Sequence, residues 1–162
     1  MKKSVALIAA VSVVGLISCG GGAASEDQVA LGASFDLKGS QMTANYMLDG
    51  WEHPSNPFDA PFEGNKAIVL NVTVAAGEED FSELSTNFSL GFGSEVVEST
   101  NYVGITDDSG LNVCGASVEA TAGDETTCDL VFEVPSDADV SAPQLVYEAL
   151  FGDEAAMTFE LK

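Results

Sequence analysis

Alternation of apolar and polar residues with a period of two is the feature of this sequence that most restricts its fold. Because successive side chains of a β-strand point to opposite sides, this period predicts strands with one face turned toward a core. It is clearest over 66–75, where the apolar face consists of Ile68, Leu70, Val72 and Val74. Over 41–48 it predicts a shared face for Met42, Ala44, Tyr46 and Leu48. Weaker alternation predicts further strands at 34–38, 88–92, 95–104, 111–120, 126–134, 144–151 and 156–161.

Turn signals rich in Gly and Asp separate these segments, at 77–80, 107–110 and 123–124. Pro135 ends the strand predicted at 126–134, because a proline nitrogen cannot donate to a ladder. Helical spacing has a single short candidate, one turn at 81–84. About seven to nine short strands joined by such turns predict an all-β chain, folded as an antiparallel β-sandwich or a small barrel.

The charge balance of the chain is strongly acidic. It has 26 Asp and Glu against 5 Lys and no Arg, a formal net charge of −21. Without a basic patch the protein cannot displace counterions from phosphates, which excludes nucleic-acid binding, and its own surface is unsuited to anionic lipid. Since 46% of residues are hydrophobic, we expect a folded domain inside an acidic shell. Such a shell suits a saline habitat and causes self-repulsion at low salt.

The N-terminal segment has the pattern of an export signal. Lys2 and Lys3 form a basic start, and the thirteen residues 5–17 contain only one polar side chain, Ser12. As a helix this run would span ~20 Å, which is less than the ~30 Å of a bilayer core. We therefore expect residues 1–18 to be a helical signal peptide that is removed from the mature protein.

The end of this segment, Leu16-Ile17-Ser18-Cys19, resembles the lipobox of bacterial lipoproteins. The resemblance implies that Cys19 receives diacylglycerol, becomes the first residue after cleavage and anchors the protein in a lipid bilayer through its acyl chains, of the palmitate type. An ordinary secretory signal with a chance cysteine is the alternative. A flexible glycine-rich tether over 19–31 would follow, and a single domain would occupy 32–162.

The location that this resemblance implies is the bacterial cell envelope. Gly20, rather than Asp, follows Cys19. In a Gram-negative cell this resembles the pattern that allows transport to the outer membrane. The domain would then face the periplasm or the exterior.

The two remaining cysteines, Cys114 and Cys128, are expected to form a disulfide. Exported proteins meet an oxidising compartment, where such a pair oxidises. The bond would close a segment of 15 residues, worth ~3 kcal/mol in the chain-entropy treatment. A metal pair and a redox pair are the alternatives, but the thirteen intervening residues do not give the Cys-x-x-Cys spacing of either.

Three segments resemble a known family: 64–66 entering the long apolar strand, 87–90, and 128–135, which reads CDLVFEVP. They are similar to bacterial lipoprotein domains of unknown function that are classed with the immunoprotective extracellular, immunoglobulin-like domains. The family signatures are G-x-x-F/A-V-V-x-V-x-V and L-V-F-E-V-P, and the likeness extends over 32–161. Its usual N-x-G/S-D turn is replaced here by Ala75-Ala76-Gly77-Glu78. The resemblance implies an immunoglobulin-like β-sandwich and no catalytic or ligand residues.

Residues typical of an active site are scarce. His53 is the only histidine, and it lies in the proline-rich stretch 51–65. The sequence contains no G-x-S-x-G nucleophile motif and no phosphate loop. Without arginine it also lacks the usual bidentate grip on phosphate or carboxylate ligands. We therefore expect no enzymatic activity, and an acidic enzyme that uses His53 and a serine is the least favoured function.

Carboxylates in the predicted turns are the weak candidates for a metal site: Asp107, Asp108, Asp124 and Glu125. Loops at one end of a sandwich can bring such oxygens together around Ca²⁺, which takes six to eight oxygen ligands. The alternative is a solvated acidic surface, and no spacing resembles an EF-hand. We expect no cofactor, with Ca²⁺ as the alternative.

Three aromatic residues of the long loop, Trp51, Phe58 and Phe62, are the candidates for a binding loop. Exposed, they would form a binding patch; buried, they would cap one end of the sandwich. The sequence therefore favours a non-enzymatic binding or structural module that displays loops or a sheet edge to another envelope or extracellular protein. A calcium- or small-ligand-binding module is the alternative.

Overall fold

The computed structural model describes residues 26–52, 61–100, 109–150 and 156–161. The predicted signal peptide, Cys19 and most of the tether lie outside these ranges. The helical element that lies wholly within them is the 3₁₀ turn η2 (Ser85–Asn87). The strands are β1 (Glu26–Val29), β2 (Ser34–Leu37), β3 (Ser40–Trp51), β4 (Asn65–Ala75), β5 (Phe81–Leu84), β6 (Phe88–Phe92), β7 (Glu95–Glu98), β8 (Ser117–Ala120), β9 (Glu125–Pro135), β10 (Gln144–Tyr147) and β11 (Met157–Leu161).

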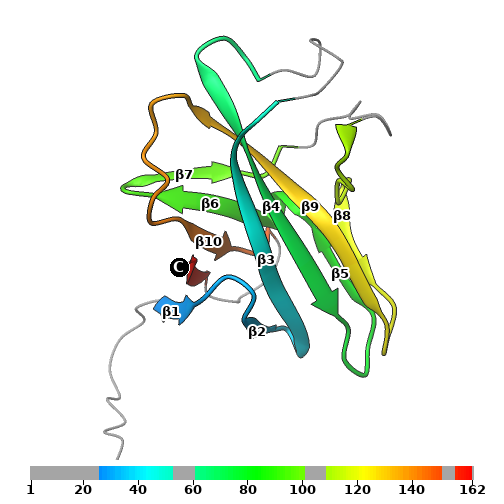
Figure 1. The fold of residues 1–162 in the computed structure, drawn as a ribbon. Coiled ribbons are helices and arrows are strands. Elements are labelled where there is room, and N and C mark those ends of the chain that lie inside the picture. Colours follow the sequence, from blue (N-terminus) through cyan, green and yellow to red (C-terminus); the bar gives the residue numbers. More distant parts are fainter. Residues whose placement is uncertain (1–25, 53–60, 101–108, 151–155, 162) are drawn as a thin grey trace, which may run out of the picture.

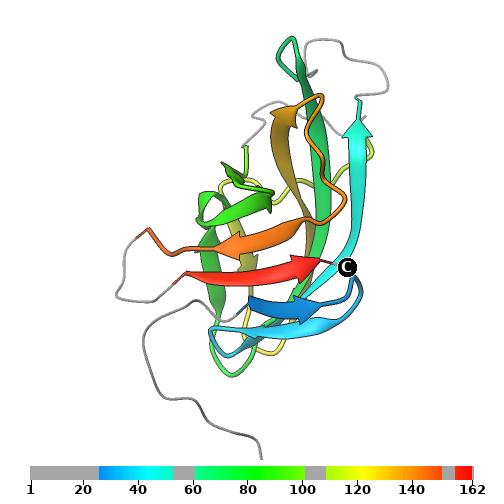
Figure 2. The same ribbon diagram turned by 90° about the vertical axis from the view of Figure 1, so that its left-hand side faces the viewer.

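The strands form two main sheets and a short two-stranded ribbon (Figure 1). Sheet A has the order β1-β11-β10-β6-β7, sheet B has the order β2-β3-β4-β9, and β5 pairs with β8. The strands of sheet A run across those of sheet B (Figure 2). The predicted all-β sandwich is confirmed. The described residues contain more strands than predicted, and the β1–β11 pair is parallel, whereas the other pairs are antiparallel.

The core lies between the two sheets, and the long strands fill it as their alternation predicts. The apolar face predicted for β4 is fully buried. The inward face of β9 is also buried, and it consists of Cys128, Leu130, Phe132 and Val134. Each apolar side chain buried in this way contributes about 1.5–3 kcal/mol. Sheet A supplies two fully buried aromatic side chains of the core, Phe88 and Tyr147, whose ring centroids are 5.3 Å apart.

The prediction that Met42, Ala44, Tyr46 and Leu48 share one face is wrong for the last two. Residues 44 and 46 of β3 pair with neighbouring residues of β4, so Asn45 is an extra residue in the strand. Such a β-bulge shifts the register and moves every later side chain to the opposite face. Met42 and Ala44 therefore lie in the core, while Tyr46 and Leu48 lie on the outer face of sheet B.

The single helical turn predicted at 81–84 is also wrong, because these residues form β5. Four residues are too few to distinguish a period of 3.6 from a period of 2. In β5, Phe81 is buried in the core and Leu84 is largely exposed. Pairing with β8 decides the conformation of this segment.

Candidate functional site

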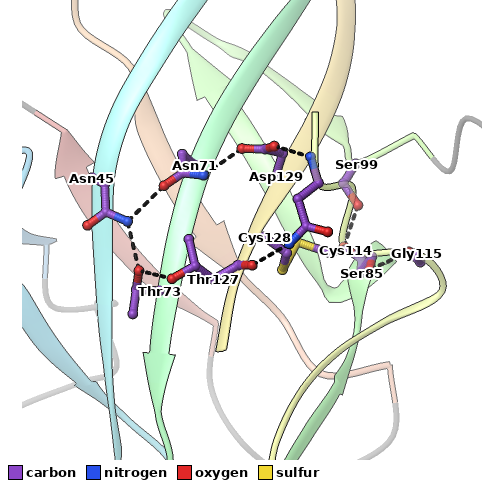
Figure 3. The surroundings of a disulfide bond; sticks show 11 residues. Asn45, Asn71, Thr73, Ser85, Ser99, Cys114, Gly115, Thr127, Cys128 and Asp129 are labelled. Atoms are coloured by element: carbon purple, nitrogen blue, oxygen red, sulfur yellow. Dashed lines mark hydrogen bonds between the residues drawn. A yellow bond between two sulfur atoms is a disulfide. The ribbon is translucent and has the colours of Figure 1, made fainter. Parts of the chain in front are cut away.

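Sheet B carries a disulfide on the inward side of β9, and its outer face combines a buried polar network with exposed apolar side chains. The predicted disulfide is present and joins Cys114 to Cys128 of β9, with a Cα–Cα distance of 4.9 Å (Figure 3). The backbone N–H of Cys114 donates to Asp129 O at 3.0 Å, and Asp129 N–H donates to Asn112 O at 2.8 Å. The segment before Cys114 therefore runs beside β9 as a short parallel addition to the sheet.

We call residues 109–114 the strap, because they cover part of the outer face of sheet B. Leu111 and Val113 of the strap pack on a small apolar cluster of β4 and β9, which consists of Ala67, Val69 and Val131. All three cluster residues are almost completely buried. The disulfide thus keeps in place a segment that shields from water the apolar side chains on the outward side of the sheet.

A polar network lies between the strap and β3 (Figure 3). Asp129 is buried, with 3% of its surface exposed, and accepts hydrogen bonds from Asn71 Nδ2 at 2.6 Å and from the backbone N–H of Asn112 at 2.7 Å. Asn45 Nδ2 donates to Asn71 Oδ1 and to Thr73 Oγ1, at 2.8 Å in each case. These bonds satisfy a carboxylate whose burial would otherwise be costly.

Beyond this network, the β3 side of the outer face is exposed. Tyr46 and Leu48 retain 45% and 41% of their surface in contact with water. Trp51, further along the same strand, is half-buried against the apolar cluster under the strap. We call Tyr46, Leu48 and Trp51 the β3 strip. It forms the uncovered continuation of the surface that the strap shields.

The structure separates the three residues of the predicted binding loop. Trp51 is partly buried and packs on the outer face of sheet B, whereas Phe62 is 80% exposed. The backbone N–H of Phe62 donates to Glu133 Oε1 of β9 at 2.7 Å, which places this residue at the end of the same sheet. Phe58 lies outside the described residues.

Glu83 is the centre of a second polar cluster, between the two main sheets. Its carboxylate lies 2.6 Å from Lys38 Nζ and accepts hydrogen bonds from Tyr147 Oη at 2.8 Å and Asn87 Nδ2 at 3.0 Å. Burial alone would raise the pKa of Glu83, but the three donors outweigh it and hold this pKa below its usual range. Burial and the bond to Glu83 raise the pKa of Tyr147 to about 12. At neutral pH Glu83 is ionised and Tyr147 protonated, so the pair is not suited to proton transfer.

The metal-site candidates are divided between described and undescribed residues. Asp124 directly precedes β9 and Glu125 is its first residue, and both are exposed. Asp107, Asp108 and His53 lie outside the described ranges. Among the described residues, no group of three or more His, Cys, Asp or Glu side chains is arranged to hold a metal ion. An open hollow of about 550 Å³ beside Lys38 is lined by further acidic residues, Glu78, Glu79 and Asp80.

These features define the chain as a disulfide-containing β-sandwich domain, and comparison with known proteins supports that class. No protein-family model and no curated protein matches the chain. Solved structures do resemble it, at identities that establish the fold alone. Within the described residues, no helix has the length and apolar character needed to cross a bilayer.

Three of these solved structures are of proteins from Bacillus subtilis and Clostridium difficile. A Bacillus subtilis protein described as a "putative lipoprotein (ycdA)" has a TM-score of 0.54 and 16% identity over 78% of this chain, which spans only 37% of that protein. An uncharacterised β-sandwich protein of Clostridium difficile has a TM-score of 0.52 and 9% identity, with 90% and 100% of the two chains covered. The yjhA protein of B. subtilis has a TM-score of 0.53 and 14% identity, with 85% and 99% covered.

Proposed function

We propose that this protein is a lipoprotein of the bacterial cell envelope, anchored through acyl chains on Cys19, whose β-sandwich domain binds another protein without catalysing a reaction. The lipobox-like sequence before Cys19 and the structural similarity to a B. subtilis protein described as a lipoprotein support the anchoring. The segments that resemble the immunoprotective extracellular domains support an immunoglobulin-like display module. One acyl chain alone anchors weakly, whereas the two or three of a bacterial lipoprotein anchor stably.

The observation that carries the binding role is the β3 strip. A strand of a sandwich core normally buries its apolar side chains, yet Tyr46 and Leu48 project outward beside a surface that is otherwise covered by the strap. Phe62 adds a strongly exposed aromatic side chain at the end of the same sheet. Exposed aromatic residues are typical of protein-binding surfaces.

Metabolic labelling tests the anchor. Cells that express the full-length protein are grown with radiolabelled palmitate, and the protein is then isolated. We expect label on the wild type and on the control Ser12→Ala, and none on Cys19→Ala. Absence of label from the wild type would contradict the anchoring.

Photo-crosslinking in living cells tests the binding role. A photoreactive amino acid replaces Leu48, and in a matched control it replaces Val96, which is 61% exposed on the other sheet. We expect one defined protein adduct from position 48 and none of the same mass from position 96. The absence of any adduct at 48, or identical adducts at both positions, would refute a binding role for the β3 strip.

A further inference from the structure

One edge of β3 is unpaired over half of its length. β2 pairs with β3 only over Ser40–Thr43, and a hydrogen bond from Gly32 N–H to Ala44 O at 2.7 Å extends this contact by one residue. From Tyr46 to Gly50, no described residue pairs with β3 on the side away from β4. Figure 2 shows this half of β3, in cyan, at the rim of the molecule. Its outward N–H and C=O groups therefore have no strand partner among the described residues, and an open edge of this kind can accept another strand.

Two bulges bracket a regular stretch of this edge. The register with β4 shifts at Asn45 and again between Asp49 and Trp51, whereas Tyr46–Asp49 pair regularly with 68–71. Bulges commonly protect sheet edges from unwanted pairing. Here the two bulges limit the regular part of the open edge to the four residues 46–49. An edge of this length admits a short extended segment and disfavours pairing along a whole strand.

The side chains of this stretch suit an added strand. Tyr46 and Leu48 lie on the outer side with nearly half of their surface exposed, and Met47 on the other side packs partly against the main core. Residues of a neighbouring strand would lie about 4.5–5.5 Å from them, close enough for aromatic and apolar pairs to form. The segment that binds here would therefore carry apolar residues at alternate positions.

The charge of the protein indicates the remaining chemistry of the partner. The chain has 26 acidic residues against 5 lysines and no arginine. Both lysines of the described ranges are in ion pairs, Lys38 with Glu83 and Lys66 with Asp49. A second copy of this chain would bring a net charge of −21 to the contact and be repelled, whereas a basic partner would be attracted.

We propose, on the basis of the protein-binding function above, that the edge at Tyr46–Asp49 accepts an extended segment of a basic partner protein by strand addition. In this segment apolar residues alternate with Lys or Arg. Backbone hydrogen bonds to β3 give affinity, and the contacts with Tyr46 and Leu48 set the register. The acidic surface accelerates the encounter.

A peptide-binding experiment tests this proposal with the full-length protein in detergent. The probe is a fluorescent peptide of alternating lysine and valine, and its binding is followed by anisotropy. There are two control peptides. One is N-methylated at every residue, which removes all the backbone donors that could face β3, and the other has glutamate in place of lysine. Leu48→Lys places a charge on the open edge, and Val96→Lys places the same charge on exposed β7 as the matched control.

We expect the wild type and Val96→Lys to bind the probe equally, and Leu48→Lys to bind it at least tenfold more weakly. The N-methylated and glutamate peptides should also bind at least tenfold more weakly. On binding, the amide hydrogens of Tyr46–Asp49 should exchange more slowly. Because both substituted positions are exposed, circular dichroism and Tm should show that both variants fold.

Any of four results would overturn the proposal. Equal binding to the two lysine variants, or undiminished binding of the N-methylated peptide, would mean that general charge attraction is responsible. No binding to the wild type at roughly 1 mM probe would exclude strand addition of this chemistry. Dimerisation of the protein that Leu48→Lys abolishes would make a second copy the occupant. If cross-linking from position 48 persists in any of these cases, the protein-binding function stands and only the mode of binding falls.

Discussion

Reduction of the Cys114–Cys128 disulfide is the perturbation whose size follows most directly from the structure. The bond joins residues 14 positions apart and closes a loop of 15 residues. In the chain-entropy treatment, opening a loop of this size releases about 10 cal/mol/K in the unfolded chain, which is about 3 kcal/mol at 25 °C. For a domain of this size, that loss corresponds to a fall in Tm of roughly 10 °C.

The native contacts of the strap determine where the effect should be seen. Leu111 and Val113 still pack on the sheet without the disulfide, and the hydrogen bonds between the strap and Asp129 can still form. The global fold should therefore persist after reduction. The strap should open locally much more often, so that the amide hydrogens of Asn112 and Cys114 exchange faster than those of the β4 interior.

The assay is urea unfolding of the oxidised and the reduced full-length protein, followed by circular dichroism. The double variant Cys114→Ser/Cys128→Ala provides a second measure, with alanine at position 128 because this side chain is 5% exposed. We expect both the reduced protein and the variant to lose about 2–4 kcal/mol of unfolding free energy. A loss below about 1 kcal/mol in both, or two free thiols in the exported protein, would refute the reasoning.

Four further predictions concern the Glu83 cluster, the close contact at Gly77 and the acidic surface. Glu83→Gln should lower the unfolding free energy by about 1–2 kcal/mol at pH 7, because Lys38 would lose the carboxylate that neutralises its charge. The pKa of Glu83 is lowered in the folded protein, so its contribution should be lost as the pH falls below about 4.5, and the variant should lack that acid-dependent step in urea unfolding. Gly77→Ala should cost about 1–3 kcal/mol, because the new methyl group would overlap the carbonyl oxygen of Gly39, and calorimetry should show the lower Tm. Molar NaCl should raise Tm relative to low salt by screening a net charge of −21, and an unchanged Tm would contradict this. Millimolar Ca²⁺ should leave Tm unchanged, whereas a rise would support the calcium-binding alternative.

The sequence was most informative where strands are long. Both faces of β4 and the inward face of β9 follow simple alternation, because eleven residues in each strand sample the period several times. The disulfide was predictable for a different reason, since two cysteines remained in a chain with the pattern of an exported protein. Chemical context, and not spacing, decided that pairing.

The register of β3 could not be predicted in the same way. Nothing in the alternating sequence of 41–48 indicates that Asn45 is an extra residue, because the bulge is stabilised by partners distant in the chain. Asn45 Nδ2 bonds to Asn71 and Thr73, which are 26 and 28 positions away. Tyr46 and Leu48 of the β3 strip were missed for this reason, whereas Trp51 was already a candidate for a binding loop.

The hydrogen bonds also connect the two features that make the outer face unusual. Asn45, the residue that turns Tyr46 outward, bonds to Asn71, and Asn71 bonds to Asp129. Asp129 accepts the backbone N–H of Asn112 in the strap, two residues before the cysteine that closes the disulfide. A buried carboxylate needs all of its donors, so loss of the strap would leave Asp129 dependent on Asn71 alone. One chain of hydrogen bonds across sheet B therefore links Asn45, whose bulge exposes the β3 strip, to the strap, which the disulfide holds in place.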